Sequence, residues 1–128
     1  RWVIPTSGPG TDLCLWEGAM QAIEAPINGM NLYAPRHCRT TVNHGQTPLE
    51  AEWMIEVSDA VIEQGLDRES GNDLLGQIAA RFENQKPAEG YDIGDCYDLM
   101  RHQPKPAYQE VIKRVKMGLT GMGLPLPE

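Results

Sequence analysis

The first part of this sequence that could do chemistry is a loop rich in glycine and proline, residues 5–10, which leads directly into a helix start. Thr11 is a good N-cap residue, and Asp12 places a negative charge in the first turn, where the helix dipole favours it. Such a loop aims several backbone N–H groups at one point and can hold an anion or a polar ligand. An ordinary helix start that needs glycines explains the same residues, because paired glycines before a helix are a weak motif.

A second group with chemical potential lies around His37, Cys38 and His44. A zinc site needs three or four ligands, and Zn²⁺ is the metal that these side chains would favour. Cys38 stands beside Arg36 and Arg39, whose charges could stabilise a thiolate nucleophile. The remaining ligands would have to come from distant residues, namely Cys14, Cys96 or His102. Unlinked side chains in an irregular loop are the simpler interpretation, so we predict no metal.

We expect most of the other reactive side chains to have structural roles, in the core or on solvated surfaces. Cys14 and Cys96 lie among apolar residues and are expected to be small core residues. Core packing is also expected of a set of large apolar side chains: Trp53, Met54, Met100, Met117 and Met122. The carboxylates of the second helix are expected on solvated faces, and no pair has the apolar surroundings of an acid–base couple. These carboxylates are Glu50, Glu52, Glu56 and Glu63.

The composition narrows the class of protein. The chain has 128 residues, 18 acidic against 11 basic side chains and a formal charge of −7. This charge argues against nucleic acid and against an anionic membrane surface as partners. Three widely spaced cysteines indicate reduced thiols in a cytoplasmic protein. No apolar run approaches the length of a membrane span. The first residue is Arg1 rather than Met, which suits a processed piece or an incompletely known sequence.

The apolar periodicity indicates a mainly helical chain of four or five helices. Residues 1–10 suit a strand end followed by a loop. A helix is expected over 11–25, with apolar residues on two faces and its end at Pro26. Residues 26–46 are expected to form an irregular loop.

Two further helices are predicted in the middle of the chain. The first covers 47–64, where Thr47 begins a capping box. The second covers 70–85 and has Ser70 as its N-cap. The link between them is short, so we expect 47–85 to fold as a helical hairpin.

The last segment, 91–128, is expected to hold a short helix within 91–102 and a final helix over about 106–119. The inward face of the final helix would consist of Val111, Ile112, Val115 and Leu119. The Gly/Pro-rich tail after it is expected to lie along a surface.

The order of several short motifs resembles that of a known family. Residues 5–17 read Pro-x-x-Gly-Pro-x-Thr-Asp-x-Cys-Leu-x-Glu, which is similar to a segment of the monomethylamine:corrinoid methyltransferases of methanogens. Residues 95–98, Asp-Cys-Tyr-Asp, resemble the Glu-Cys-Tyr-Asp of that family. Further matches occur at the same spacing: Ala22, Ile23, Gly29, Ala51, Glu52, Met54, Gly123 and Leu124.

The resemblance implies a fold and a reaction. The family consists of (β/α)8 TIM barrels several times longer than this chain, so the chain resembles their C-terminal portion, a single partial domain with a last barrel strand near residues 2–4. The reaction implied is methyl transfer from a small methylated donor to the cobalt of a corrinoid carried on a separate protein, with no cofactor bound directly. The residues implied to face the substrate or the corrinoid are Trp2, Ile4, Thr6, Ser7 and Gly8. The pyrrolysine and the acidic active-site residues would lie upstream, so the catalytic residues are unknown here.

One departure from the family bears on the substrate. The methylamine enzymes carry a Gln and a Tyr where this chain has Trp2 and Ile4. The change removes two polar groups expected to face the substrate, which fits a relative that acts on another methyl donor.

The expected partners are the corrinoid protein, the rest of the barrel and further copies in a homo-oligomer. Three hypotheses remain open. The chain is part of a corrinoid-dependent methyltransferase in methanogenesis and is inactive alone, or it is a non-catalytic helical interaction module descended from that family, or the loop from Arg36 to His44 is a small metal or thiol site.

Overall fold

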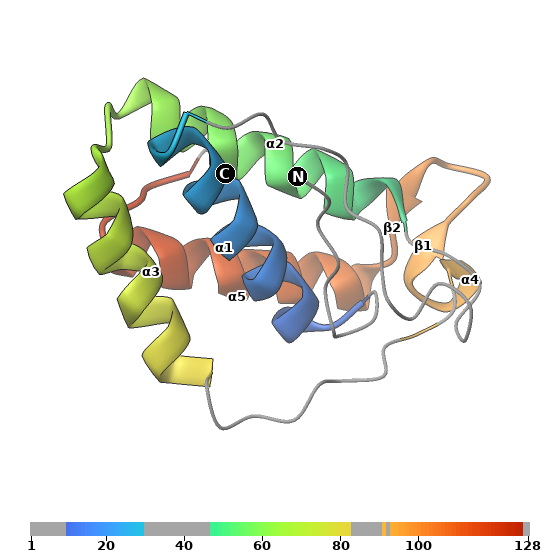
Figure 1. Cartoon of the computed structure of the whole chain (residues 1–128). Coiled ribbons are helices and arrows are strands. Elements are labelled where there is room, and N and C mark those ends of the chain that lie inside the picture. The colour runs from blue at the N-terminus through green and yellow to red at the C-terminus, as the bar shows by residue number, and fades with distance from the viewer. Residues whose placement is uncertain (1–9, 30–46, 83–90, 92, 127–128) are drawn as a thin grey trace.

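The computed structural model describes residues 10–29, 47–82, 91 and 93–126 (Figure 1). These residues form five helices and a two-stranded antiparallel sheet, which confirms the mainly helical fold. In chain order the elements are α1 (Asp12–Ile27), α2 (Pro48–Glu63), α3 (Arg68–Phe82), α4 (Ile93–Cys96), β1 (Tyr97–Asp98), β2 (Gln103–Pro104) and α5 (Pro106–Gly121). The strand predicted near residues 2–4 lies outside the described residues.

Helix α1 is the centre of the molecule and packs against α2, α3 and α5 (Figure 1). Its apolar residues cover two faces, as expected, because a helix with neighbours on several sides must be apolar on each of them. The buried positions are Cys14, Leu15, Trp16, Gly18, Ala19, Ala22, Ile23 and Ala25. Small residues among them let the neighbouring helices approach closely.

The contact between α1 and α2 combines apolar packing with one buried hydrogen bond. The indole Nε1–H of Trp53 donates to the carbonyl oxygen of Leu15 at 2.8 Å. A Cβ at Gly18 would lie 3.4 Å from Cγ of Met54, so this glycine sits at the closest approach of the two helices. The buried indole therefore has its polar atom satisfied while its ring fills the core.

Pro26 does not end α1, in contrast to our expectation. The helix continues to Ile27, and Pro26 occupies its last turn. A proline there removes only one backbone donor, and the end of the helix is held by other bonds. The N–H of Asn28 donates to the carbonyl of Ala25, and its side-chain amide donates to the carbonyl of Glu24 at 2.9 Å.

Helix α3 begins earlier than predicted. Asp67, rather than Ser70, holds its start: the backbone N–H of Ser70 donates to Oδ1 of Asp67 at 2.8 Å. Hydrogen bonds from the backbone and the hydroxyl of Ser70 lower the pKa of the Asp67 carboxyl. Gly65, with φ of +63°, makes the turn after α2 that a side chain would strain.

The expected hairpin of 47–85 is not what the structure shows. Helices α2 and α3 each make their main contacts with α1 rather than with one another. The closest approach of α3 to α1 is at Gly71, where a Cβ would lie 2.6 Å from Cδ1 of Ile27. A central apolar helix offers both of them more surface to bury than they offer each other.

The segment 91–102 holds only one turn of helix, α4, and then a tight hairpin instead of more helix. Tyr97 pairs with Pro104 and Asp98 with Gln103 across β1 and β2. His102, with φ of 55°, makes the sharp turn of the chain between these strands. Helix α5 begins at Pro106, and on its inner face Tyr108, Val115 and Leu119 are buried. Val111 and Ile112 are only half-buried.

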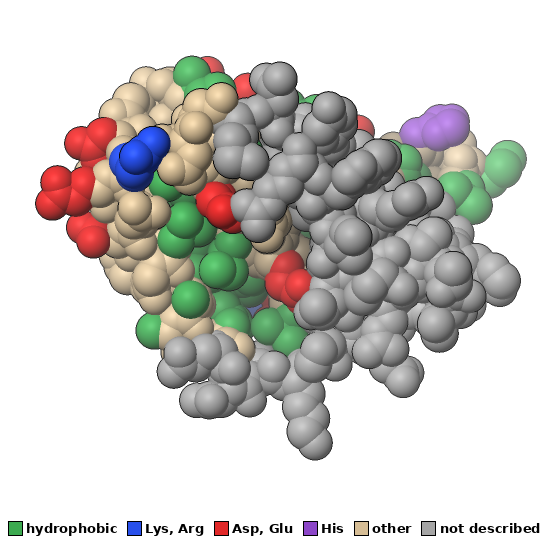
Figure 2. All heavy atoms as spheres, viewed as in Figure 1, with side chains coloured by type: hydrophobic (Ala, Val, Ile, Leu, Met, Phe, Trp, Pro, Cys, Tyr) green, Lys and Arg blue, Asp and Glu red, His purple; other side chains and the backbone are tan. Residues whose placement is uncertain are grey.

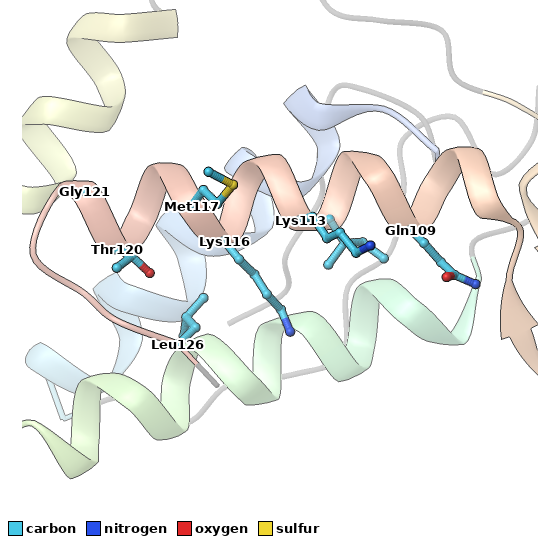
Figure 3. Close-up of a pocket in the computed structure, with 8 residues that line it drawn as sticks. Gln109, Lys113, Lys116, Met117, Thr120, Gly121 and Leu126 are labelled. Atoms are coloured by element: carbon cyan, nitrogen blue, oxygen red, sulfur yellow. The ribbon is translucent and has the colours of Figure 1, made fainter. Parts of the chain in front are cut away.

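The methionines divide between the core and the surface. Met54 is buried as expected, but Met100 and Met117 are 90% and 74% exposed, so core packing was wrong for these two. Met100 is at the tip of the hairpin, and Met117 lies on the outer face of α5 (Figure 3). In Figure 2 apolar side chains show in the middle of the described surface, and acidic side chains gather at the start of α3. No helix within the described ranges is long and apolar enough to cross a membrane.

Gly118 of α5 offers a test of the packing. A Cβ there would lie 2.7 Å from Cζ2 of Trp16, whereas nothing lies within 4 Å of a Cβ at Gly76 of α3. We expect Gly118→Ala to lower the free energy of unfolding, because overpacking of about 1–3 kcal/mol outweighs the better helix propensity. Gly76→Ala should raise it by roughly 0.5–1 kcal/mol. Urea unfolding of both variants measures this, and equal effects would contradict the packing.

Candidate functional site at the start of helix α1

The most unusual polar group of the described residues is the carboxyl of Glu50, which is 3% exposed. The backbone N–H of Thr47 donates to its Oε1 at 2.8 Å, and the Thr47 hydroxyl donates to Oε2. The hydroxyl of Tyr108, from α5, also donates to Oε2 at 3.0 Å. A solvated Glu50 was therefore a wrong expectation. The capping-box geometry turns its side chain back onto Thr47 and into the interior.

Tyr108 joins this carboxyl to the start of α1. Its side chain is 1% exposed. Burial raises the pKa of the phenol strongly, and the negative charge of Glu50 and neighbouring Cys14 raise it further, while a hydrogen bond from the backbone of Gly10 acts in the opposite direction. The phenol thus stays protonated and links α2 and α5 to Gly10, two residues before α1.

Gly10 can hold its place only because it is glycine. Its φ is +85°, and a Cβ would lie 2.6 Å from Cδ2 of Tyr91 and 3.1 Å from Cβ of Cys96. Next to it, the hydroxyl of Thr11 accepts from the N–H of Cys14 at 3.3 Å, which confirms Thr11 as the N-cap of α1. The end of the Gly/Pro loop is therefore fixed by close packing as well as by hydrogen bonds.

Cys96 packs against Gly10 and forms one wall of this site. The side chain is 4% exposed. Burial, then the charges of Glu50 and Asp95, raise the pKa of the thiol from 9.0 to about 11. A thiol held protonated cannot serve as a thiolate at neutral pH. Cys14 is also buried, so both cysteines are core residues as predicted.

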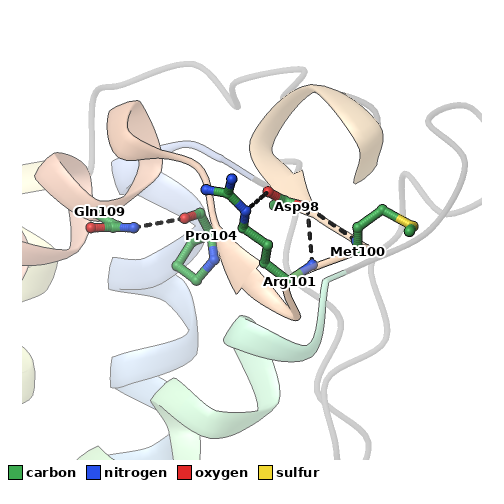
Figure 4. A network of polar contacts seen from close by, with 5 residues as sticks. All are labelled: Asp98, Met100, Arg101, Pro104 and Gln109. Atoms are coloured by element: carbon green, nitrogen blue, oxygen red, sulfur yellow. Dashed lines mark hydrogen bonds and ion pairs between the residues drawn. The ribbon is translucent and has the colours of Figure 1, made fainter.

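The hairpin beside Cys96 is stiffened by a small polar network (Figure 4). Oδ1 of Asp98 accepts from the backbone N–H groups of Met100 and Arg101 at 3.0 and 3.1 Å. Gln109 of α5 donates its Nε2–H to the carbonyl of Pro104 at 2.8 Å. The N–H of Lys105 donates to the carbonyl of Cys96 at 2.9 Å, which closes the hairpin next to Gly10.

A separate groove of about 880 Å³ runs along α5, on the side that faces α2 (Figure 3). Lys116 spans from α5 to α2, where its Nζ lies 2.9 Å from Oε1 of Glu56. Lys113 and Glu110 form an exposed pair at 3.4 Å. The apolar part of the lining includes Ile112, Met117 and Leu126.

The residues predicted from the resemblance to face the substrate or the corrinoid lie outside the described residues. This holds for Trp2, Ile4, Thr6, Ser7 and Gly8. The same is true of the predicted metal or thiol loop with His37, Cys38 and His44. Of the distant ligands considered for that loop, Cys14 and Cys96 are buried in the core and His102 is exposed at the hairpin.

Sequence reasoning missed Glu50 and Tyr108 as a pair. A signal for Glu50 was present, because a capping-box glutamate points back towards its N-cap and is flanked by the apolar Leu49 and Trp53. Tyr108 stands seven and eleven residues before Val115 and Leu119, which places it on their helix face. Nothing in the sequence showed that the two side chains, 58 positions apart, would meet.

The arrangement of these helices defines the class of protein. The structure superposes with a TM-score of 0.82 on a crystal structure of the Methanosarcina barkeri monomethylamine methyltransferase MtmB, at 25% sequence identity. A structure of the hydroxylamine complex of MtmB gives the same values. Both matches cover 94% of this chain and 26% of that protein, a TIM-barrel methyltransferase. The fold is thus that of a portion of such a barrel enzyme.

The sequence places the chain in a family. The model of the monomethylamine methyltransferase MtmB family matches residues 2–124, so the chain belongs to this family. It is 28% identical over 124 residues to MtmB2 of Methanosarcina acetivorans and 27% identical to MtmB of Methanosarcina mazei. It spans about a quarter of the length of these relatives.

Removal of the phenol hydroxyl tests the buried link. We expect Tyr108→Phe to destabilise the fold by about 1–3 kcal/mol, because a buried carboxyl loses one of its donors. Tyr91→Phe removes a hydroxyl from a side chain that is 55% exposed and should change stability by less than about 0.5 kcal/mol. Urea unfolding distinguishes them, and equal stability of the two variants would show that the hydrogen bond to Glu50 contributes nothing.

The raised pKa of Cys96 predicts a loss of stability at alkaline pH. Below pH 9.0 the thiol is protonated in both the folded and the unfolded chain. Between pH 9.0 and about 11 the unfolded chain releases the proton while the folded chain keeps it, so stability falls with rising pH. We expect the difference in urea midpoint between wild type and Cys96→Ala to change across this interval. A constant difference would mean that the pKa is not raised.

Proposed function

We propose that this chain is the C-terminal part of a cytoplasmic, corrinoid-dependent methyltransferase. The donor is a small methylated compound, and the acceptor is the cobalt of a corrinoid held on a separate protein. The reduced corrinoid would supply the nucleophile for the methyl group, and the demethylated remainder of the donor would be released with the electron pair of the broken bond. The observation that supports this most directly is the family match over residues 2–124.

The role proposed for the described residues is positioning. In a TIM barrel the active site lies at the C-terminal ends of the strands, so a loop that follows a late strand faces the substrate. Gly10 is the last residue of such a loop, and it is fixed against Tyr91 and Cys96 and tied to Tyr108. The buried carboxyl of Glu50 holds the phenol in turn. The loop that would bind and orient the substrate is therefore held at Gly10 by buried, hydrogen-bonded side chains.

We expect the methyl donor to differ from that of the methylamine enzymes. Trp2 and Ile4 stand where the methylamine enzymes carry Gln and Tyr. Two apolar side chains at these positions favour a donor with a less polar or bulkier methylated group over methylamine itself, because they offer no hydrogen bond to an ammonium group.

The test uses the longer natural protein that contains this segment, with its corrinoid protein reduced to Co(I). Methyl transfer is followed by the change in the visible spectrum of the corrinoid. We expect activity with a methylated donor other than monomethylamine, and a gain with monomethylamine in the Trp2→Gln, Ile4→Tyr double variant. Absence of methyl transfer from every methylated donor tested, with the natural protein folded and the corrinoid reduced, would overturn the proposal.

A second function, a non-catalytic helical module, has one observation in its favour. The described residues close a hydrophobic core of their own around α1. Against it stand exposed apolar side chains such as Ile55 and Ile62, at 58% and 64% exposure, which suit contact with further protein. Intact mass of the natural protein and thermal unfolding of the 128-residue chain separate the two. A natural chain of this length that unfolds cooperatively as a monomer favours the module.

A further inference from the structure

A second pocket, of about 280 Å³, lies between the first turns of α1 and the end of α3, with α5 behind it. It is distinct from the site formed by Gly10, Tyr108 and Glu50, which we call the loop anchor, and from the groove along α5. Three helices contribute to its lining, which consists of Asp12, Trp16, Arg81, Phe82, Arg114 and Val115.

Two arginines from different helices line this pocket, and neither forms an ion pair with a carboxylate of the described residues. Among the described residues, no ion pair involves Arg81 or Arg114, although the chain has 18 acidic and only 11 basic side chains. In an acidic protein a cation on the surface has many possible partners. Two guanidinium groups left free at one small pocket therefore point to an anion from outside the chain.

Aromatic rings hold one of these arginines in place. The guanidinium carbon of Arg81 lies 5.9 Å from the ring centroid of Trp16 and 5.8 Å from that of Phe82. The two rings are themselves in contact, with centroids 5.1 Å apart. Stacking uses the face of the guanidinium and leaves its N–H edge available, which is the edge that grips a phosphate or carboxylate.

Asp12 adds a restriction on the kind of anion. Its Oδ1 accepts from the backbone N–H of Leu13 at 2.9 Å, and no described donor contacts Oδ2. A carboxylate accepts hydrogen bonds and repels an anion that has none to give. An oxyanion that still carries an O–H can donate it to Asp12 while its other oxygens face the arginines.

We propose that this pocket binds inorganic phosphate, in a form that keeps an O–H, through Arg81 and Arg114, with Asp12 accepting that O–H. The last proton of inorganic phosphate dissociates only at strongly alkaline pH, so near pH 6.5 every inorganic phosphate ion carries at least one O–H. Sulfate has a similar shape and no O–H at that pH. The proposal rests on this chain alone and does not depend on methyl transfer.

The experiment is a titration of the 128-residue chain with inorganic phosphate and with sulfate at pH 6.5 and low ionic strength, followed by NMR. We expect saturable binding of phosphate and at least about tenfold weaker binding of sulfate. Arg114→Ala should weaken phosphate binding by about tenfold. Asp12→Asn should remove the preference for phosphate, because an amide can donate to sulfate.

The matched control is Arg68→Ala, which removes the same charge from the opposite end of α3 and should leave binding unchanged. Circular dichroism confirms that each variant is folded. Glycerol phosphate is a second probe: its phosphoryl group is mostly a dianion without an O–H at this pH, so we expect it to bind more weakly than inorganic phosphate. Equal binding of phosphate and sulfate by the wild type, or equal affinities of the Arg114 and Arg68 variants, would overturn it.

Discussion

The structure depends on the burial of α1 on more than one side. Leu15, Ala19, Ala22 and Ile23 are fully buried, and α2, α3 and α5 all pack on this one helix. Its burial removes a large apolar area from water, at roughly 25 cal/mol per Å². Small residues at the crossings allow the close approach, Gly18 towards α2 and Gly71 towards the end of α1. A helix with only one apolar face could not organise three neighbours in this way.

The second constraint is a buried polar group rather than an apolar one. Glu50 lies 3% exposed among apolar side chains, and such a group is tolerated only where donors surround it. Thr47 and Tyr108 supply these donors, and Tyr108 also meets the backbone of Gly10. These contacts therefore fix α1, α2 and α5 relative to one another. This fixes Gly10, the last residue of the segment proposed to face the substrate.

The loop anchor and the arginine pocket treat charge in opposite ways. At the loop anchor, the Glu50 carboxyl is buried and accepts hydrogen bonds from Thr47 and Tyr108, which makes a rigid support. At the pocket of Arg81 and Arg114, charge is left at the surface with its hydrogen-bonding edges open. In our proposals the first arrangement positions the loop and the second recognises an anion, because an internally satisfied group has no capacity left for a ligand.

Local physical chemistry is what the sequence alone determined. Periodicity gave the long helices within a few residues, Thr11 and Thr47 stand before the helices they were expected to begin, and the order of motifs indicated the family that the comparisons then confirmed. Tertiary structure decided what depends on distant partners. It placed α2 and α3 on α1 instead of on each other, and it buried Glu50 against Tyr108, 58 positions away. It also exposed Met100 and Met117. Propensity and spacing act over one or two turns, whereas burial is set by whichever surfaces meet when the whole chain packs.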